Sequence, residues 1–103
     1  MDMNTFYDLN EKVIGIFRAG VAWSRPERKR LGSYDEHVEQ GFIYNINDEK
    51  IAVFKNGTVT DLKNNVLGEY KNNKIYINGE VVGRYIANDF AAAASIALLY
   101  GAK

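Results

Sequence analysis

Hydrophobic and polar residues alternate along most of the chain, and a four-residue phrase within this alternation recurs five times. Each copy consists of a branched apolar residue, Gly or Ala, a variable residue and an aromatic residue. The copies are Ile14-Gly15-Ile16-Phe17, Leu31-Gly32-Ser33-Tyr34, Ile51-Ala52-Val53-Phe54, Leu67-Gly68-Glu69-Tyr70 and Val82-Gly83-Arg84-Tyr85. Period-two alternation in β-branched and aromatic residues predicts half-buried β-strands. The recurrence predicts one small structural unit that is copied and packed side by side.

Short runs rich in Asn and Gly separate the predicted strands and indicate tight turns. The pair Asn78-Gly79 is the strongest signal, because both residues accept the positive φ angles of a type I′ hairpin turn. The unit is therefore a hairpin of about 15 residues. The predicted units span residues 6–20, 21–41, 42–57, 58–73 and 74–88.

Each second strand carries the phrase, and its alternation predicts which residues share a face. The branched and variable residues are expected on one face, and the Gly and the aromatic residue on the other. A glycine leaves bare backbone, across which an aromatic ring from a neighbouring strand can lie. Such packing would explain why the glycine and the aromatic residue recur together.

The second unit, residues 21–41, departs from the pattern. Its first strand is Val21-Ala22-Trp23, followed by a long link from Ser24 to Lys29 and, after the phrase, by a polar stretch from Asp35 to Gln40. Pro26 has no backbone N–H, so the link is expected to be a turn, an edge segment or a single helical turn that Ser24 and Glu27 cap. Irregular loops on a regular scaffold usually carry specificity, which places the specific function in this unit.

The pattern changes at Asn88 into an Ala-rich apolar segment, which predicts a C-terminal helix over residues 89–100. Asn88 is a suitable N-cap, Asp89 suits the positive end of a helix, and Gly101 is a natural stop. The segment is too short to span a bilayer, but it is apolar nearly all round and must be covered on more than one side. It either packs against the hairpins as a plug or is shared between subunits. We predict a homo-oligomer that associates through residues Phe90 to Tyr100.

Tandem hairpins that end in Ile/Leu/Val-Gly-x-Phe/Tyr and are joined by Asn-Gly-like turns resemble the β-flower family of small bacterial proteins. The resemblance covers residues 6–87 and is cleanest over 58–73 and 74–88. It implies a mainly β fold of radially arranged hairpins, or petals, followed here by the C-terminal helix. The irregular second unit is either a fifth petal or an insertion in a ring of four. The resemblance implies no catalytic residues.

Composition narrows the function classes. The chain has 103 residues, 47% of them hydrophobic, which suits one domain over residues 1–103. Thirteen basic and thirteen acidic residues cancel, so no overall field attracts nucleic acid or an anionic membrane. The absence of Cys excludes disulfides and thiolate metal sites. Because the polar start lacks the apolar run of a secretory signal, we predict a cytoplasmic protein.

The segment Trp23-Ser24-Arg25-Pro26-Glu27-Arg28-Lys29-Arg30 is the sharpest functional candidate, with four cations and one indole in eight residues. Arginine forks hold phosphate oxygens, and an indole stacks on a nucleotide base. The alternative is a solvated basic loop that the nearby acidic residues of 35–39 partly neutralise. Tyr76 is out of phase with its apolar neighbours and is expected on the outer side. The candidate ligand-binding residues are Trp23, Arg25, Arg28, Lys29, Arg30 and Tyr76.

Catalytic and metal-binding patterns are missing from the sequence. His37, the single histidine, lies between Glu36 and Glu39, and a surface histidine in an acidic loop is a simpler interpretation than an acid–base catalyst. No phosphate-binding glycine loop, Gly-x-Ser-x-Gly or His-Glu-x-x-His occurs. We therefore predict no metal, no cofactor and a non-catalytic binding or interaction module. The alternative function is binding or sequestration of a small phosphorylated ligand such as a nucleotide.

Overall fold

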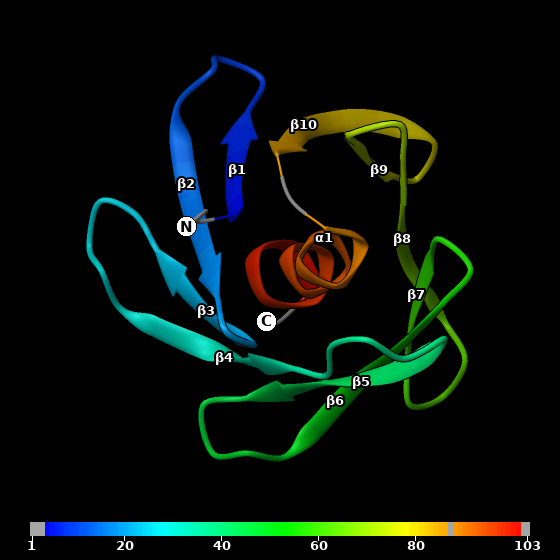
Figure 1. Ribbon diagram of the computed structural model, residues 1–103. Coiled ribbons are helices and arrows are strands. Elements are labelled where there is room, and N and C mark those ends of the chain that lie inside the picture. Colours follow the sequence, from blue (N-terminus) through cyan, green and yellow to red (C-terminus); the bar gives the residue numbers. More distant parts are fainter. Residues whose placement is uncertain (1–3, 87, 102–103) are drawn as a thin grey trace.

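The computed structural model describes residues 4–86 and 88–101, within which ten β-strands follow one another along the chain. Each strand pairs antiparallel with its sequence neighbours, and β10 pairs with β1, so that the sheet closes into a barrel (Figure 1). A mainly β fold followed by a C-terminal helix is thereby confirmed. The strands are β1 (Asn4–Asp8), β2 (Val13–Arg18), β3 (Val21–Ser24), β4 (Arg30–Tyr34), β5 (Gln40–Asn45), β6 (Lys50–Lys55), β7 (Thr58–Asp61), β8 (Val66–Lys71), β9 (Lys74–Ile77) and β10 (Glu80–Ile86).

Two-residue turns join several of these strands, and local chemistry explains them. Asn78 and Gly79 have φ angles of 55° and 81°, as the type I′ turn requires. The links Ala19-Gly20, Asn56-Gly57 and Asn72-Asn73 also have positive φ at both residues. These short turns set the register of the strands they join. Ala87, in the last predicted unit, lies outside the described residues.

Every hairpin carries a bulge at the branched residue of the phrase. In the first hairpin, Gly15 pairs with Phe6 and Val13 with Tyr7, which leaves Ile14 as the extra residue. A bulge bends the strand and interrupts its alternation. The prediction that the branched and variable residues share a face is therefore wrong, because the branched residues pack against the core. These residues are Ile14, Leu31, Ile51, Leu67 and Val82.

The glycine and the aromatic residue of the phrase face the interior. The predicted packing of an aromatic ring from a neighbouring strand across the glycine, however, is not found at most of the repeat glycines. Among the glycines of the phrase, Gly83 is the one at which the ring of a neighbouring strand, that of Phe6, lies 2.8 Å from where a Cβ atom would be. Outside the phrase, the Phe54 ring of β6 lies 2.5 Å from the corresponding point at Gly41 of β5. At three other repeat glycines, a Cβ atom would meet a side chain of the C-terminal helix. These pairs are Gly15 with Leu99 at 3.1 Å, Gly32 with Leu98 at 3.0 Å and Gly68 with Ile96 at 2.9 Å.

The helix lies inside the ring of strands (Figure 1). It consists of α1 (Asp89–Ser95) and a π-helical continuation, η1 (Ile96–Gly101). Asn88 is the N-cap, and its side-chain oxygen accepts a hydrogen bond of 2.9 Å from the Ala91 N–H. Each residue from Ala91 to Leu98 is buried, so of the two predicted roles the helix fills that of a plug within a single chain. Among the described residues, no helix has the length and apolar character needed to cross a membrane.

The repeat aromatics form part of the core, and one of them has an unsatisfied hydroxyl. Tyr34 is 4% exposed, and its hydroxyl has no hydrogen-bond partner of good geometry among the described residues, although the backbone of Gly20 lies near it. The Tyr85 hydroxyl, by contrast, donates to Asp89 Oδ1 at 3.3 Å. Burial raises the pKa of Tyr34 above the usual 10.0 and that of Tyr85 to about 12.

Tyr34→Phe is expected to raise the free energy of unfolding by about 1 kcal/mol at neutral pH, because it removes a buried polar group without a partner. The folded state also holds the Tyr34 proton more tightly than the unfolded state. The part of the stability that depends on this proton is therefore complete below pH 10, and it is lost as the pH rises further. Urea denaturation at neutral pH and near pH 11 should show a shallower alkaline loss in the variant. Tyr85→Phe is the matched control and should lower stability, since it breaks the bond to Asp89; a loss with Tyr34→Phe would contradict the interpretation.

Candidate functional site

Several hairpin loops share one kind of tight turn, and the loop of the second hairpin is a longer form of it. In the first hairpin, Asp8 Oδ1 accepts hydrogen bonds from the N–H groups of Asn10 and Lys12, and the Asp8 carbonyl accepts one from Glu11. Asn45 and Asp61 hold their loops in the same way. Side chains of this kind stabilise turns by bonding to nearby backbone.

In the second hairpin the same turn contains one more residue. The Ser24 carbonyl accepts from the Arg28 N–H at 2.9 Å, and Ser24 Oγ accepts from the Lys29 N–H at 3.3 Å. The Arg25–Pro26 peptide bond is cis. Of the three predicted forms, the link is thus a turn, and Ser24 caps this turn and not a helix. The extra residue leaves Arg25 and Arg28 at the tip of the hairpin.

Three of the candidate residues line one pocket beside this turn. Trp23, on β3, is 37% exposed and lies next to Arg25 and Arg28. The pocket has a volume of about 360 Å³ and is completed by Ile16 and Arg18 of β2. An exposed indole and three arginine side chains therefore line one small hollow on the outer face of the sheet.

Ile16 and Arg18 are the pocket residues that the sequence analysis missed. The turn at Ala19-Gly20 pairs β2 with β3 so that Ile16 lies opposite Trp23. Because alternate residues share a face, Arg18 lies on the same side as Ile16. The signal was present in the sequence, since a two-residue turn sets the register of both strands. The predicted cluster does not include these two residues, because it consists of neighbours in sequence alone.

The remaining candidates lie elsewhere. Arg30 points to the next hairpin, where its Nη2 is 3.7 Å from Asp48 Oδ1. Lys29 contributes its backbone to the turn but does not line the pocket. Tyr76 lies on the outer side of β9, in a separate groove about 550 Å³ in volume. The six candidate residues therefore lie in four places, which are the pocket, the turn, the contact with the next hairpin and the groove at Tyr76.

The electrostatics of the pocket favour an anion. No carboxylate lines it, and within residues 4–86 and 88–101 none of Arg18, Arg25 and Arg28 forms an ion pair. Neighbouring guanidinium groups repel each other, and an anion between them relieves this repulsion while it accepts charge-assisted hydrogen bonds. The indole and Ile16 supply an apolar wall on which a flat ring can stack.

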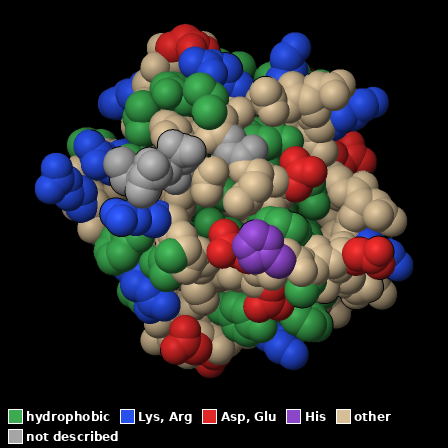
Figure 2. Space-filling model, viewed as in Figure 1, with side chains coloured by type: hydrophobic (Ala, Val, Ile, Leu, Met, Phe, Trp, Pro, Cys, Tyr) green, Lys and Arg blue, Asp and Glu red, His purple; other side chains and the backbone are tan. Residues whose placement is uncertain are grey.

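The single histidine and the acidic residues near it lie away from the Trp23 pocket. His37 lies in the link between β4 and β5, and its ring meets that of Phe90 edge-on with centroids 5.7 Å apart. Figure 2 shows the histidine among acidic side chains on the face viewed along the helix. In the part of the chain that the structure describes, no group of three or more His, Asp or Glu residues is placed to hold a metal ion. Comparisons with protein-family models, with curated proteins and with solved structures find no match.

Proposed function

We propose that the chain is a non-catalytic binding module that takes up a small phosphorylated ligand with a flat ring, such as a nucleotide. The observation that carries the proposal is the pocket in which Trp23 is exposed beside Arg18, Arg25 and Arg28, none of which forms an ion pair with another described residue. In this proposal the ring stacks on the indole, and the arginines bind the phosphate oxygens. This arrangement supports the ligand-binding alternative over a solvated basic loop, because the indole and three arginine side chains line the same pocket.

The expected affinity for such a ligand follows from these contacts. Stacking of one base on an aromatic side chain contributes roughly 1–3 kcal/mol, and a hydrogen bond to a charged group contributes about 1.5–3 kcal/mol. Part of this energy is offset because the long arginine side chains lose freedom on binding. A dissociation constant on the order of 100 μM is therefore expected, with an affinity that falls as salt is added.

Trp23 is the single tryptophan of the chain, so its fluorescence reports directly on the pocket. Titration with AMP should change this fluorescence saturably, whereas adenosine, which lacks the phosphate, should bind at least about tenfold more weakly. Arg28→Ala should weaken AMP binding by about tenfold or more. Lys29→Ala is the matched control, because Lys29 belongs to the same turn but not to the pocket, and it should change affinity less than about twofold. Equal binding of AMP and adenosine, or equal losses in both variants, would contradict the proposal.

We infer a β-flower arrangement with five radial petals, which the consecutive pairing of strands around the closed sheet and the helix at its centre support. A cytoplasmic location and association of copies through Phe90 to Tyr100 remain predictions. Between Phe90 and Tyr100, the residues Phe90, Leu99 and Tyr100 are half-buried, while Ala91 to Leu98 are buried within one chain. Any contact between copies would therefore use the two ends of the helix.

A further inference from the structure

The outer face of the sheet contains five equivalent junctions between successive hairpins. At each junction, the variable residue of the phrase pairs with a residue on the first strand of the next hairpin, and at four of the five that residue is aromatic. The pairs are Ile16 with Trp23, Ser33 with Tyr44, Val53 with Thr60, Glu69 with Tyr76 and Arg84 with Tyr7. The junctions can therefore be compared position by position.

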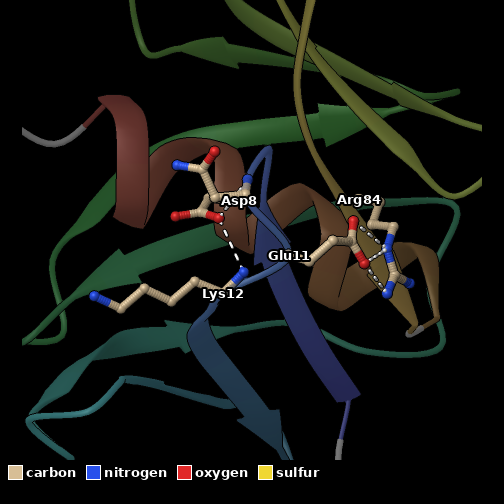
Figure 3. Close-up of polar contacts among 5 residues, drawn as sticks. Asp8, Glu11, Lys12 and Arg84 are labelled. Atoms are coloured by element: carbon tan, nitrogen blue, oxygen red, sulfur yellow. Dashed lines mark hydrogen bonds and ion pairs between the residues drawn. The ribbon is translucent and has the colours of Figure 1, made fainter.

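The junction between β10 and β1 shows how this scaffold binds a guanidinium group. The guanidinium of Arg84 lies over the Tyr7 ring, 4.1 Å from its centroid. Its Nη2 and Nε donate to Glu11 Oε1 at 2.6 and 2.9 Å, and Nε also lies 3.0 Å from Oε2 (Figure 3). These hydrogen bonds lower the pKa of the Glu11 carboxyl group. A ring face and a carboxylate thus hold one planar cation.

The junction between β8 and β9 also brings a ring and a carboxylate together, but here the variable residue supplies the carboxylate and the hairpin loop does not. Tyr76 takes the place of Tyr7, and Glu69 stands where Arg84 stands in the other junction. Among the described residues, Glu69 has no ion-pair partner and no cation lies over the Tyr76 ring. Both residues line the groove of about 550 Å³, together with Thr58 and Lys71.

Lys71 limits where a cation can enter this groove. It lies two residues beyond Glu69 on the same strand, which places the two backbone positions about 6.6 Å apart. A cation at the Lys71 end would be repelled, whereas one between Glu69 and Tyr76 would be attracted by the carboxylate and the ring face. The charged and aromatic groups therefore select one end of the groove.

We propose that this end of the groove is a second binding site, which accepts a guanidinium group from outside the chain, as on an arginine side chain of a peptide or protein partner. The group lies on the Tyr76 ring and donates hydrogen bonds to the Glu69 carboxylate, so that it meets the same two kinds of group as Arg84, with the carboxylate supplied from the neighbouring strand. Guanidinium suits the site better than ammonium, because it is planar, stacks on a ring and bonds a carboxylate through two N–H groups. The proposal is independent of the Trp23 pocket, whose charge has the opposite sign.

The test uses N-acetyl-arginine amide as the probe and N-acetyl-citrulline amide as its uncharged counterpart of the same shape. In two-dimensional ¹H–¹⁵N NMR of the whole chain, the arginine probe should shift the amide signals of Glu69 and Tyr76 saturably, with a millimolar dissociation constant expected for one exposed charged group. Glu69→Gln should weaken binding about fivefold or more, whereas Lys71→Gln should leave it unchanged or tighten it. Equal shifts with the citrulline probe, or no saturable shift with the arginine probe, would overturn the proposal.

A second variant tests the comparison between the junctions. Arg84→Ala removes the internal cation from Tyr7 and Glu11, so the arginine probe should then also shift the amide signals of these two residues. A variant that acquires no such second set of shifts would contradict the assignment. Arg28→Ala, which tests the Trp23 pocket, should leave the Glu69 and Tyr76 shifts unchanged, so that failure of either proposal is recognised separately.

Discussion

Ala93→Asp is expected to lower the free energy of unfolding by about 3–5 kcal/mol, which is a large fraction of the stability of a typical domain of this size. Ala93 is 0% exposed and lies in α1, the helix that the ring of strands surrounds. A carboxylate at this position would be buried among apolar groups without a partner, and its desolvation is costly whether it stays charged or takes up a proton. Urea denaturation followed by circular dichroism measures the loss.

Val66→Asp is the matched control, because it introduces the same carboxylate at a residue of β8 that is 62% exposed. It is expected to change stability by less than about 1 kcal/mol. The comparison also separates the two roles predicted for the helix. If the helix served only to join copies, Ala93→Asp would yield a folded monomer of undiminished stability, and this result would contradict the plug.

Gly83→Ala is expected to lower the free energy of unfolding by about 3 kcal/mol. Gly83 lies in β10 opposite Asp8 of β1, in the strand pair that closes the barrel. A Cβ atom here would overlap the Tyr7 carbonyl oxygen and approach the Phe6 ring to 2.8 Å. The carbonyl belongs to the backbone of the paired strand and cannot move without disturbing the closure. Thermal and urea unfolding should both record the loss.

Gly15→Ala is the control for this effect, since it adds the same methyl group at the equivalent position of the first phrase. Its nearest neighbours would be Leu99 Cδ1 at 3.1 Å and Phe17 Cε1 at 3.3 Å, both on side chains that can adjust. The expected loss is about 1 kcal/mol or less. Equal losses in the two variants would contradict the view that the paired backbone at Gly83 determines the cost.

Part of the candidate site could be predicted from the sequence, and the reason is local. Trp23, Arg25 and Arg28 lie on one short hairpin, so their proximity follows from the turn that joins β3 to β4. Arg18 enters the pocket through the register of the preceding turn and could have been found from it. Arg30 could not be placed, because its partner Asp48 belongs to the next hairpin and their approach depends on how the two hairpins pack.

The strands, the type I′ turn at Asn78-Gly79 and the N-cap at Asn88 follow from the sequence, because each depends on the conformational preferences of a few adjacent residues. The closure of β10 on β1, the helix inside the barrel and the contact of Arg84 with Glu11 depend on the tertiary structure, because they join residues far apart in the chain. The same distinction applies to the repeat phrase. Its alternation predicts that the branched residue lies on the outer face with the variable residue. The bulge at each branched residue instead turns that side chain to the core, where the ring of strands and the helix together exclude water.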